Sequence, residues 1–228
     1  MPMKLLILGK GKTGSLVAQV AGERGHLVEA FGSAQNDKAA ALTPEHLERF
    51  DVIIDFTTPT AAVQNCEACL RCGKDMVVGT TGWYDHLAGL REQVIRNKTG
   101  LVFGANFSIG INLFFDVARE AAAALKHGYT GQIFERHHVQ KKDAPSGTAL
   151  MLQNTIKDAV SKELEIISFR EGQVVGMHEI VLDSPNDDIY LCHDSKSRRG
   201  FAEGAVRAAE WLRGRKGFFD FRDIWREV

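Results

Sequence analysis

The sequence lacks any long hydrophobic run, and this absence excludes a membrane-spanning helix. The apolar run nearest the start, residues 5–8, is also far too short for a signal peptide. An excess of either charge is missing too, because the formal net charge of the 228-residue chain is -1. Without a broad basic field, nucleic-acid binding is not expected. We therefore expect a soluble, cytoplasmic protein with no membrane or nucleic-acid partner.

Cysteine is scarce, with four residues in the chain. Cys66, Cys69 and Cys72 recur at three-residue spacing on an expected helix over residues 60–71. A metal site is one interpretation, but zinc ligands normally come as two separated pairs. Burial of one helix face against a sheet is the simpler one, so no metal is predicted. Cys192 is isolated, which leaves no secreted disulfide framework and favours a reducing compartment.

What the sequence does contain begins with an apolar strand, a glycine turn and a helix. Lys4–Leu8 is followed by Gly9-Lys10-Gly11-Lys12-Thr13-Gly14 and then by a helical run. This order is typical of a dinucleotide-binding site, where the three glycines allow a tight turn, a close pyrophosphate and helix-to-strand packing in that order. The predicted cofactor residues in this turn are Gly9, Gly11, Lys12, Thr13 and Gly14.

The tip of the second predicted strand, Leu27–Phe31, bears on the choice of nicotinamide cofactor. An acid at such a tip would bind the ribose hydroxyls, but here the tip is Gly32-Ser33 and Glu29 lies inside the strand. Ser33, with two lysines of the glycine turn nearby, suits a 2′-phosphate. We therefore expect NADPH or NADH, with NADPH slightly favoured.

Strands and helices alternate through the first half of the chain. Further strands are expected over residues 52–56, 76–78 and 101–103. The alternation predicts an α/β fold with a Rossmann-type, doubly wound parallel sheet. Cofactor contacts should come from the carboxyl ends of its strands, where Phe56 lies among small and polar residues.

The second half has a different pattern. A long helix over residues 109–126 is followed by strand-like runs over 132–139, 166–170, 173–182 and 189–193, and then by a helical tail over 201–213. This order predicts a second α+β domain with a mixed or antiparallel sheet and helices on one face. We expect residues 1–107, completed by 198–228, to form the dinucleotide-binding domain. Residues 108–197 should form the domain for substrate binding and oligomerisation.

The segment 135–149 concentrates groups that bind and protonate an anion. Ser146, Gly147 and Thr148 precede a helical run and offer free N–H groups at a helix start. Lys141 and Lys142 add positive charge, and His137 with His138 can move protons near neutral pH. Each feature alone is more often an ordinary cap, a solvated lysine or a satisfied histidine. Together they predict a site for a doubly anionic substrate.

One point of geometry limits this interpretation. In a regular strand His137 and His138 would point to opposite faces. Both can reach one site only if the strand ends or bends there.

Several motifs together resemble one known family, 4-hydroxy-tetrahydrodipicolinate reductase (dihydrodipicolinate reductase) of bacterial lysine and diaminopimelate biosynthesis. The motifs are Ile54-Asp55-Phe56-Thr57, Val78-Gly79-Thr80-Thr81-Gly82, Ala105-Asn106-Phe107-Ser108-Ile109-Gly110, the segment 137–149 and Gly204-Ala205-Val206-Arg207. The resemblance implies an NAD(P)H-dependent oxidoreductase. Its reaction would reduce a cyclic, doubly carboxylated imine to tetrahydrodipicolinate, with loss of water from the hydroxylated precursor.

The resemblance also implies roles for individual residues. His137 would be the general acid, and Lys141 the cation that binds substrate and stabilises developing charge. The carboxylates would be held by His138, Ser146, Gly147 and Thr148. The nicotinamide would be lined by Gly79, Thr81, Ala105 and Phe107. Arg198 is counted with the cofactor residues and would lie close to the active site. A homotetramer built through the second-domain sheets is implied as well.

The chain departs from the family pattern at three places. Its glycine turn is short, Gly32-Ser33 replaces the usual acid or arginine, and the segment 169–176 predicts a trimmed loop. Two other functions remain open at this point. One is another two-domain amino-acid or semialdehyde dehydrogenase, such as an aspartate or homoserine dehydrogenase; the other is a noncatalytic dinucleotide sensor. The block 141–148 argues against the first, and its proton donors argue against the second.

Overall fold

A computed structural model describes all residues from 1 to 228, and the chain divides into two compact units. Unit 1 comprises Met1–Ile109 and Arg199–Val228, and unit 2 comprises Gly110–Arg198. None of the helices combines the length and apolar character needed to span a bilayer.

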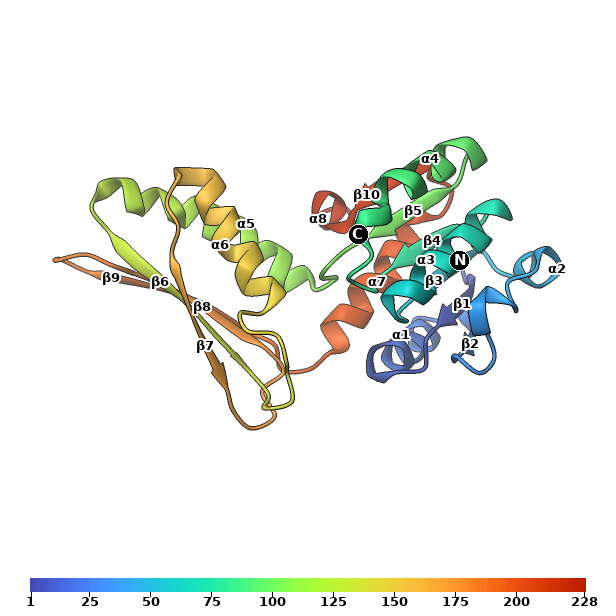
Figure 1. Cartoon of the computed structure of the whole chain (residues 1–228), viewed down its shortest axis with the longest axis horizontal. Helices are drawn as coiled ribbons and strands as arrows, with labels where there is room; N and C mark the ends of the chain where they lie inside the picture. Colours follow the sequence, from blue (N-terminus) through green and yellow to red (C-terminus); the bar gives the residue numbers. More distant parts are fainter. The chain divides into compact units, whose positions relative to one another are not determined.

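Unit 1 is built on a six-stranded parallel sheet with strand order β10-β5-β4-β3-β1-β2 (Figure 1). Its strands are β1 (Lys4–Leu8), β2 (Leu27–Phe31), β3 (Val52–Asp55), β4 (Asp75–Val78), β5 (Gly100–Phe103) and β10 (Gly217–Asp220). From β1 the chain first adds β2 on one side and then β3, β4 and β5 on the other. This reversal creates a switch point beside the carboxyl ends of β1 and β3, where ligands of such folds bind. The predicted doubly wound sheet is confirmed.

Helices cover both faces of this sheet. They are α1 (Lys12–Glu23), α2 (Pro44–Leu47), α3 (Pro59–Arg71), α4 (Leu87–Asn97), α7 (Arg199–Leu212) and α8 (Phe221–Ile224), with short 3₁₀ turns η1 (Asp37–Ala39) and η2 (Tyr84–His86). Buried side chains of α1, α7 and α8 share one core cluster, and those of α2, α3 and α4 share the other.

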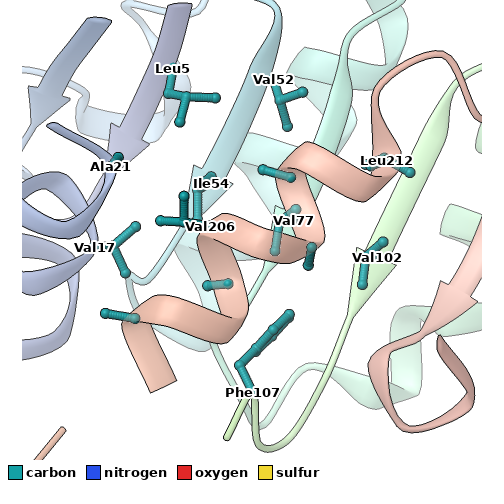
Figure 2. Close-up of a cluster of buried hydrophobic side chains, with 14 of the residues drawn as sticks. Leu5, Val17, Ala21, Val52, Ile54, Val77, Val102, Phe107, Val206 and Leu212 are labelled. Atoms are coloured by element: carbon teal, nitrogen blue, oxygen red, sulfur yellow. The ribbon is translucent and has the colours of Figure 1, made fainter. Parts of the chain in front are cut away.

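Alternation along the strands explains the two clusters. Leu5 and Ile7 belong to the first cluster, whereas Leu6 and Leu8 belong to the second, because successive strand side chains point to opposite faces. Figure 2 shows α7 crossing the face of the sheet that carries the first cluster, with Val206 and Leu212 directed at the strands. These four apolar side chains of β1 are at most 1% exposed, which is the burial expected of a parallel strand covered on both sides.

The cysteines of α3 behave as core residues. Cys66 and Cys69 are fully buried in the second cluster, and burial is the main cause that raises the pKa of each thiol. A raised pKa opposes the thiolate that metal binding or nucleophilic attack would require. The three-residue spacing of these cysteines therefore reflects packing of one face of α3 against the sheet.

Unit 2 consists of a four-stranded mixed sheet, order β7-β6-β8-β9, with helices on one face (Figure 1). Its elements are α5 (Ile109–Ala121), η3 (Ala122–His127), β6 (Thr130–His137), α6 (Gly147–Val160), β7 (Glu165–Arg170), β8 (Met177–Asp183) and β9 (Asp188–Asp194). The β6–β7 pair is parallel, and the pairs β6–β8 and β8–β9 are antiparallel. Side chains of α5, η3 and α6 pack on Ile133 and Ile180 of the sheet.

The opposite face of this sheet carries apolar side chains that no helix of unit 2 covers. Phe134 stacks on Phe169 at 6.5 Å between ring centroids, and Phe169 is 41% exposed. Tyr190 of β9 is 63% exposed. An aromatic surface of this kind is typical of an interface.

Several predicted boundaries were wrong. The helix expected over residues 109–126 becomes a 3₁₀ turn at Ala122, where the chain tightens before Gly128 in the left-handed region. The strand expected over 173–182 begins only at Met177, because the preceding residues form the turn from β7, with Gly172 at φ +50. The strand expected over 132–139 ends at His137. β10 and α8 were not predicted, because four residues each are too few to show a periodicity.

Candidate active site

The three glycines of the turn after β1 have different surroundings. Gly9 has φ +104, and a β-carbon there would lie 2.1 Å from the carbonyl oxygen of Phe56. A β-carbon on Gly14 would lie 2.0 Å from the carbonyl oxygen of Gly9. Beside Gly11, in contrast, there is no atom within 4 Å of such a carbon. Gly9 and Gly14 are therefore required by packing, whereas the space at Gly11 is open to a ligand.

The start of α1 faces this open space. Gly11 is its N-cap, and no side chain accepts from the first N–H groups of the helix. Uncapped N–H groups at the positive end of a helix bind a phosphate well. The turn thus fits a pyrophosphate, as the spacing predicts.

Two cavities adjoin the turn within unit 1. One, of about 360 Å³, is lined by Gly11, Lys12, Thr13, Gly14, Phe56, Thr57, Pro59, Gly79, Thr80 and Thr81. The second, of about 540 Å³, shares Gly11, Phe56 and Thr57 and continues past the tip of β2. Together they place the predicted residues of the glycine turn and of the β3 and β4 ends along one surface.

The β2 end of the larger cavity contains residues that motif reasoning missed. Besides Gly32 and Ser33, it is lined by Asn36, Asp37 and Lys38 of the following turn. The Nζ of Lys10 donates to Oε1 of Gln35 at 2.7 Å, and the same oxygen accepts from the Gly32 N–H at 3.0 Å. Two lysines, Lys10 and Lys38, and one carboxylate, Asp37, therefore line this cavity outside the strand tip itself.

A buried carboxylate organises the ends of β3 and β4. Asp55, fully buried, accepts from the hydroxyl of Thr80 at 2.6 Å, the hydroxyl of Thr57 at 2.8 Å and the amide of Asn65 at 2.7 Å. Burial raises the pKa of Asp55, and these hydrogen bonds act against the rise. Asn65 in turn accepts from Asn36 at 2.9 Å. The network links the two cavities, although its members are far apart in sequence.

The two aromatic residues predicted to contact the cofactor, Phe56 and Phe107, differ in their surroundings. A β-carbon on Gly79 would lie 2.2 Å from the ring of Phe56, so that ring covers Gly79. Phe107 is 2% exposed and packs on Phe221 at 4.6 Å between ring centroids. Its side chain therefore belongs to the core, which leaves only its backbone for a ligand. Ala105, near it in the loop after β5, is exposed.

Unit 2 brings His137 to the end of β6, beside a buried acid. Nδ1 of His137 hydrogen-bonds Oε2 of Glu135, whose side chain is 0% exposed. Nη2 of Arg170 donates to Oε1 of the same carboxylate at 2.7 Å. Burial opposes ionisation of Glu135, but the bonds from Arg170 and His137 hold its pKa at about 2. Burial lowers the pKa of His137, and Glu135 counteracts this effect.

The predicted helix cap is present at the start of α6. Oγ of Ser146 accepts from the Ala149 N–H at 3.2 Å and lies 3.1 Å from Nε2 of His178. A β-carbon on Gly147 would meet no atom within 4 Å, so the first turn of α6, which continues through Thr148, is open. The sequence did not predict a place for His178 in this site. Burial is the main cause that lowers the pKa of His178 to about 3, and the nearby His137 lowers it further.

β6 ends at the first of the two adjacent histidines, which is the condition that the sequence sets for both side chains to reach one site. β6 stops at His137, and the N–H of His138 bonds instead to the carbonyl of Val174 at 2.8 Å. Nε2 of His138 lies 3.5 Å from Nη2 of Arg198, and both residues belong to unit 2. Nζ of Lys141 contacts both carboxylate oxygens of Asp143 at 2.8 Å.

Glu135, His137 and His178 also offer ligand atoms within 4.8 Å of one another, a spacing that a metal ion can use. Two of these groups already bond to each other, and the Arg170 guanidinium contacts the carboxylate. The positive charge of this guanidinium disfavours the binding of a metal cation at the same carboxylate. The arrangement is therefore better described as a hydrogen-bonded acid–base cluster.

A doubly wound sheet with a glycine turn, together with a second unit that carries a histidine acid–base cluster, defines the class of two-domain, dinucleotide-dependent oxidoreductases. Comparison with known proteins identifies the family. The model described as "Dihydrodipicolinate reductase, N-terminus" matches residues 3–107, and the one described as "Dihydrodipicolinate reductase, C-terminus" matches residues 110–225. The chain belongs to the dihydrodipicolinate reductase family, which confirms the resemblance seen in its motifs.

Curated relatives agree with this assignment. The 4-hydroxy-tetrahydrodipicolinate reductase of Christiangramia forsetii is 34% identical over 99% of both chains. That of Chromobacterium violaceum is 40% identical over 78% of this chain and 74% of its own. A dipicolinate-bound dihydrodipicolinate reductase from Paenisporosarcina sp. TG-14 has the same fold, with a TM-score of 0.79 at 24% identity over 98% of this chain and 100% of that chain.

Proposed function

We propose that this chain reduces 4-hydroxy-tetrahydrodipicolinate to tetrahydrodipicolinate with NAD(P)H, in lysine and diaminopimelate biosynthesis. Family membership and the full-length match to curated reductases support this proposal. The observation that carries it is the buried Glu135–His137 pair, which lies close in the fold to the open start of α6. A proton donor beside an anion-binding helix start is what reduction of a dicarboxylated imine requires.

His137 is proposed as the general acid. When bound, the nicotinamide cofactor supplies the hydride to one ring carbon, and a proton must reach the neighbouring carbon. Burial keeps the pKa of His137 low in the free protein, but a bound dianion adds negative charge that favours the imidazolium. Substrate binding would therefore charge the acid that the reaction uses.

The carboxylates are proposed to bind at Gly147, Thr148 and Lys141, with Ser146 and His138 beside them. Gly147 offers an unobstructed backbone, and Ser146 already caps the helix through Oγ. The lysine is held by Asp143, so a substrate carboxylate would compete with that contact. Arg198, beside His138, adds a further cation.

For the cofactor, unit 1 fits a dinucleotide because the space at Gly11 is open and the α1 start is uncapped. The pyrophosphate would bind at Gly11, Lys12 and Thr13, with Gly9 and Gly14 shaping the turn. The nicotinamide would lie near Gly79, Thr81, Ala105 and Phe56, with the backbone of Phe107. NADPH is slightly favoured over NADH because Lys10, Ser33 and Lys38 line the cavity at the β2 tip. Asp37 lines the same cavity and supports use of NADH as well.

We also propose a cytoplasmic homotetramer, with the uncovered face of the unit 2 sheet as its interface. Phe134, Phe169 and Tyr190 support this assembly because they form an aromatic surface on that face.

The deciding experiment follows nicotinamide absorbance while substrate is generated in situ from pyruvate and aspartate semialdehyde by the preceding synthase. Oxidation that depends on the synthase is the expected result, and parallel runs with NADH and NADPH measure the preference. Binding of both cofactors without turnover would contradict the proposal and favour a noncatalytic sensor. Reduction of NAD⁺ or NADP⁺ by aspartate or homoserine in a synthase-free control would favour another dehydrogenase.

A further inference from the structure

Glu135 is a fully buried carboxylate with hydrogen-bond partners on both of its oxygens. Its Oε2 bonds Nδ1 of His137, and its Oε1 accepts from Arg170 at 2.7 Å and from the Ser146 N–H at 3.3 Å. Glu135 and His137 are two residues apart on β6 and therefore share one face of the strand. Arg170 is the register partner of His137 on β7. Three separate segments thus converge on one carboxylate.

The charge state of Glu135 determines where His137 carries its proton. With its pKa at about 2, Glu135 is ionised near neutral pH and can only accept hydrogen bonds. Nδ1 of His137 must then be the donor, which leaves Nε2 as the nitrogen that gains and loses a proton. Nε2 lies beside Gly176, where an added β-carbon would be 3.0 Å away. The absence of a side chain at position 176 keeps that nitrogen uncrowded.

Other charged or titratable groups also face His137. They are Lys141 from the loop after β6, Arg170 from β7 and His178 from β8, whose ring meets that of His137 edge-on at 5.2 Å. Lys141 and Arg170 both disfavour the imidazolium. Glu135 is the one carboxylate among these groups that favours it.

We propose that Glu135 is a positioning residue that fixes the His137 ring with Nε2 as the proton-donating atom and joins this ring to the substrate-binding start of α6 through Ser146. The inference rests on the proposed function, since it assigns a support for the proposed acid. It extends that function by naming which nitrogen acts and what holds it.

The first test needs no enzymatic activity and no change at Glu135. In protein labelled with ¹⁵N-histidine, the imidazole nitrogens of neutral His137 are measured by NMR, and the signal is assigned by its loss in His137→Gln. The expected result is protonation at Nδ1, the less common form of a free histidine side chain. Protonation at Nε2 in the wild-type protein would overturn the proposal, whether or not the reductase assay succeeds.

The second test compares Glu135→Gln with Glu165→Gln, an exposed acid on β7 that contacts Gln132. Glu135→Gln should lower kcat by about tenfold to a hundredfold while the KM for the cofactor, bound by unit 1, stays unchanged. The loss should be greater at high pH, because removal of the carboxylate disfavours the imidazolium. Glu135→Asp should restore part of kcat, and Glu165→Gln should match the wild type.

Two kinetic outcomes would contradict the proposal. One is a kcat of Glu135→Gln within about twofold of the wild type at every pH. The other is an equal loss at every pH with the Nδ1 proton retained, which a merely structural role would produce. If Glu135→Gln does not fold, the tautomer of the wild-type protein decides the question. Inactivity of the wild type itself would reject the proposed function and leave the tautomer result standing.

Discussion

The carbonyl oxygen of Gly9 occupies the place that a side chain on Gly14 would need, 2.0 Å from the position of its β-carbon. The first turn of α1 therefore packs directly on the backbone of the glycine turn. Gly11, between them, has no such contact and lies at φ -74, a backbone conformation that alanine adopts easily.

Gly14→Ala and Gly11→Ala should consequently fail in different ways. Gly14→Ala forces a steric clash and should destabilise the protein by roughly 1–3 kcal/mol or more. Gly11→Ala should keep the melting temperature and raise the KM for the dinucleotide, because its methyl group enters the space of the pyrophosphate. Thermal unfolding and cofactor titration separate the two effects. Equal destabilisation by both variants would contradict this division of roles.

The buried carboxylate of Asp55 should be needed for stability as well as for the cavity lining. In Asp55→Asn, an amide N–H₂ must face hydroxyl and amide donors, so at least one buried hydrogen bond is lost. We expect a cost of about 1–3 kcal/mol and weaker dinucleotide binding. Asp85→Asn, an exposed change in the same unit, is the control. Unchanged urea denaturation of Asp55→Asn would argue against an organising role.

The proposed roles of His137 and Lys141 predict distinct kinetic changes. His137→Ala should lower mainly kcat, by roughly a hundredfold or more, because a general acid acts only in the transition state. Lys141→Ala should lower kcat and raise the KM for the substrate, since a cation contributes to both states. Lys142→Ala provides a neighbouring exposed lysine as control. Near-normal turnover in both variants would reject the assignment.

The low pKa of His178 predicts that the folded protein loses stability in acid. Its pKa is about 3 in the folded protein against about 6.5 when unfolded, so the unfolded chain binds more protons between these values. Stability should be complete above pH 6.5 and fall by up to about 1.4 kcal/mol per pH unit below it. Melting temperatures from pH 7 to 4.5 should show a shallower slope in His178→Gln than in wild type. The exposed His127→Gln should retain the wild-type slope.

The aromatic face of the unit 2 sheet predicts where assembly can be disrupted. Tyr190→Asp places a charge where the proposed interface is apolar, and should convert a tetramer into smaller species without loss of the melting transition. Light scattering coupled to size-exclusion chromatography measures the change. Leu113→Asp alters an exposed apolar residue on α5, across the sheet, and should leave the mass unchanged. A wild-type monomer would refute the proposed assembly.

Local patterns predicted much of this molecule. The apolar run before Gly9 and the glycine spacing were sufficient for β1 and α1, because both patterns depend on residues adjacent in sequence. The alternation of strands and helices was sufficient for the doubly wound sheet. Ser146 and Gly147 likewise showed the α6 start directly. The cluster around Glu135 and His137 was not accessible in this way, because Arg170 and His178 come from other strands of the sheet. The Asp55 network was hidden for the same reason: its hydrogen-bond donors lie on separate elements.

The position of β10 has a consequence for synthesis of the chain. Unit 1 begins with the first residues, but its sheet is completed only by a strand formed at residues 217–220, after the whole of unit 2 has been made. Unit 2 is continuous and can reach its final structure while the remainder is still being translated. The nascent dinucleotide-binding unit, in contrast, must wait with β5 unpaired on one side and with the face that α7 later covers still exposed. Of the two units, the one whose translation starts earlier is therefore the one that is completed later.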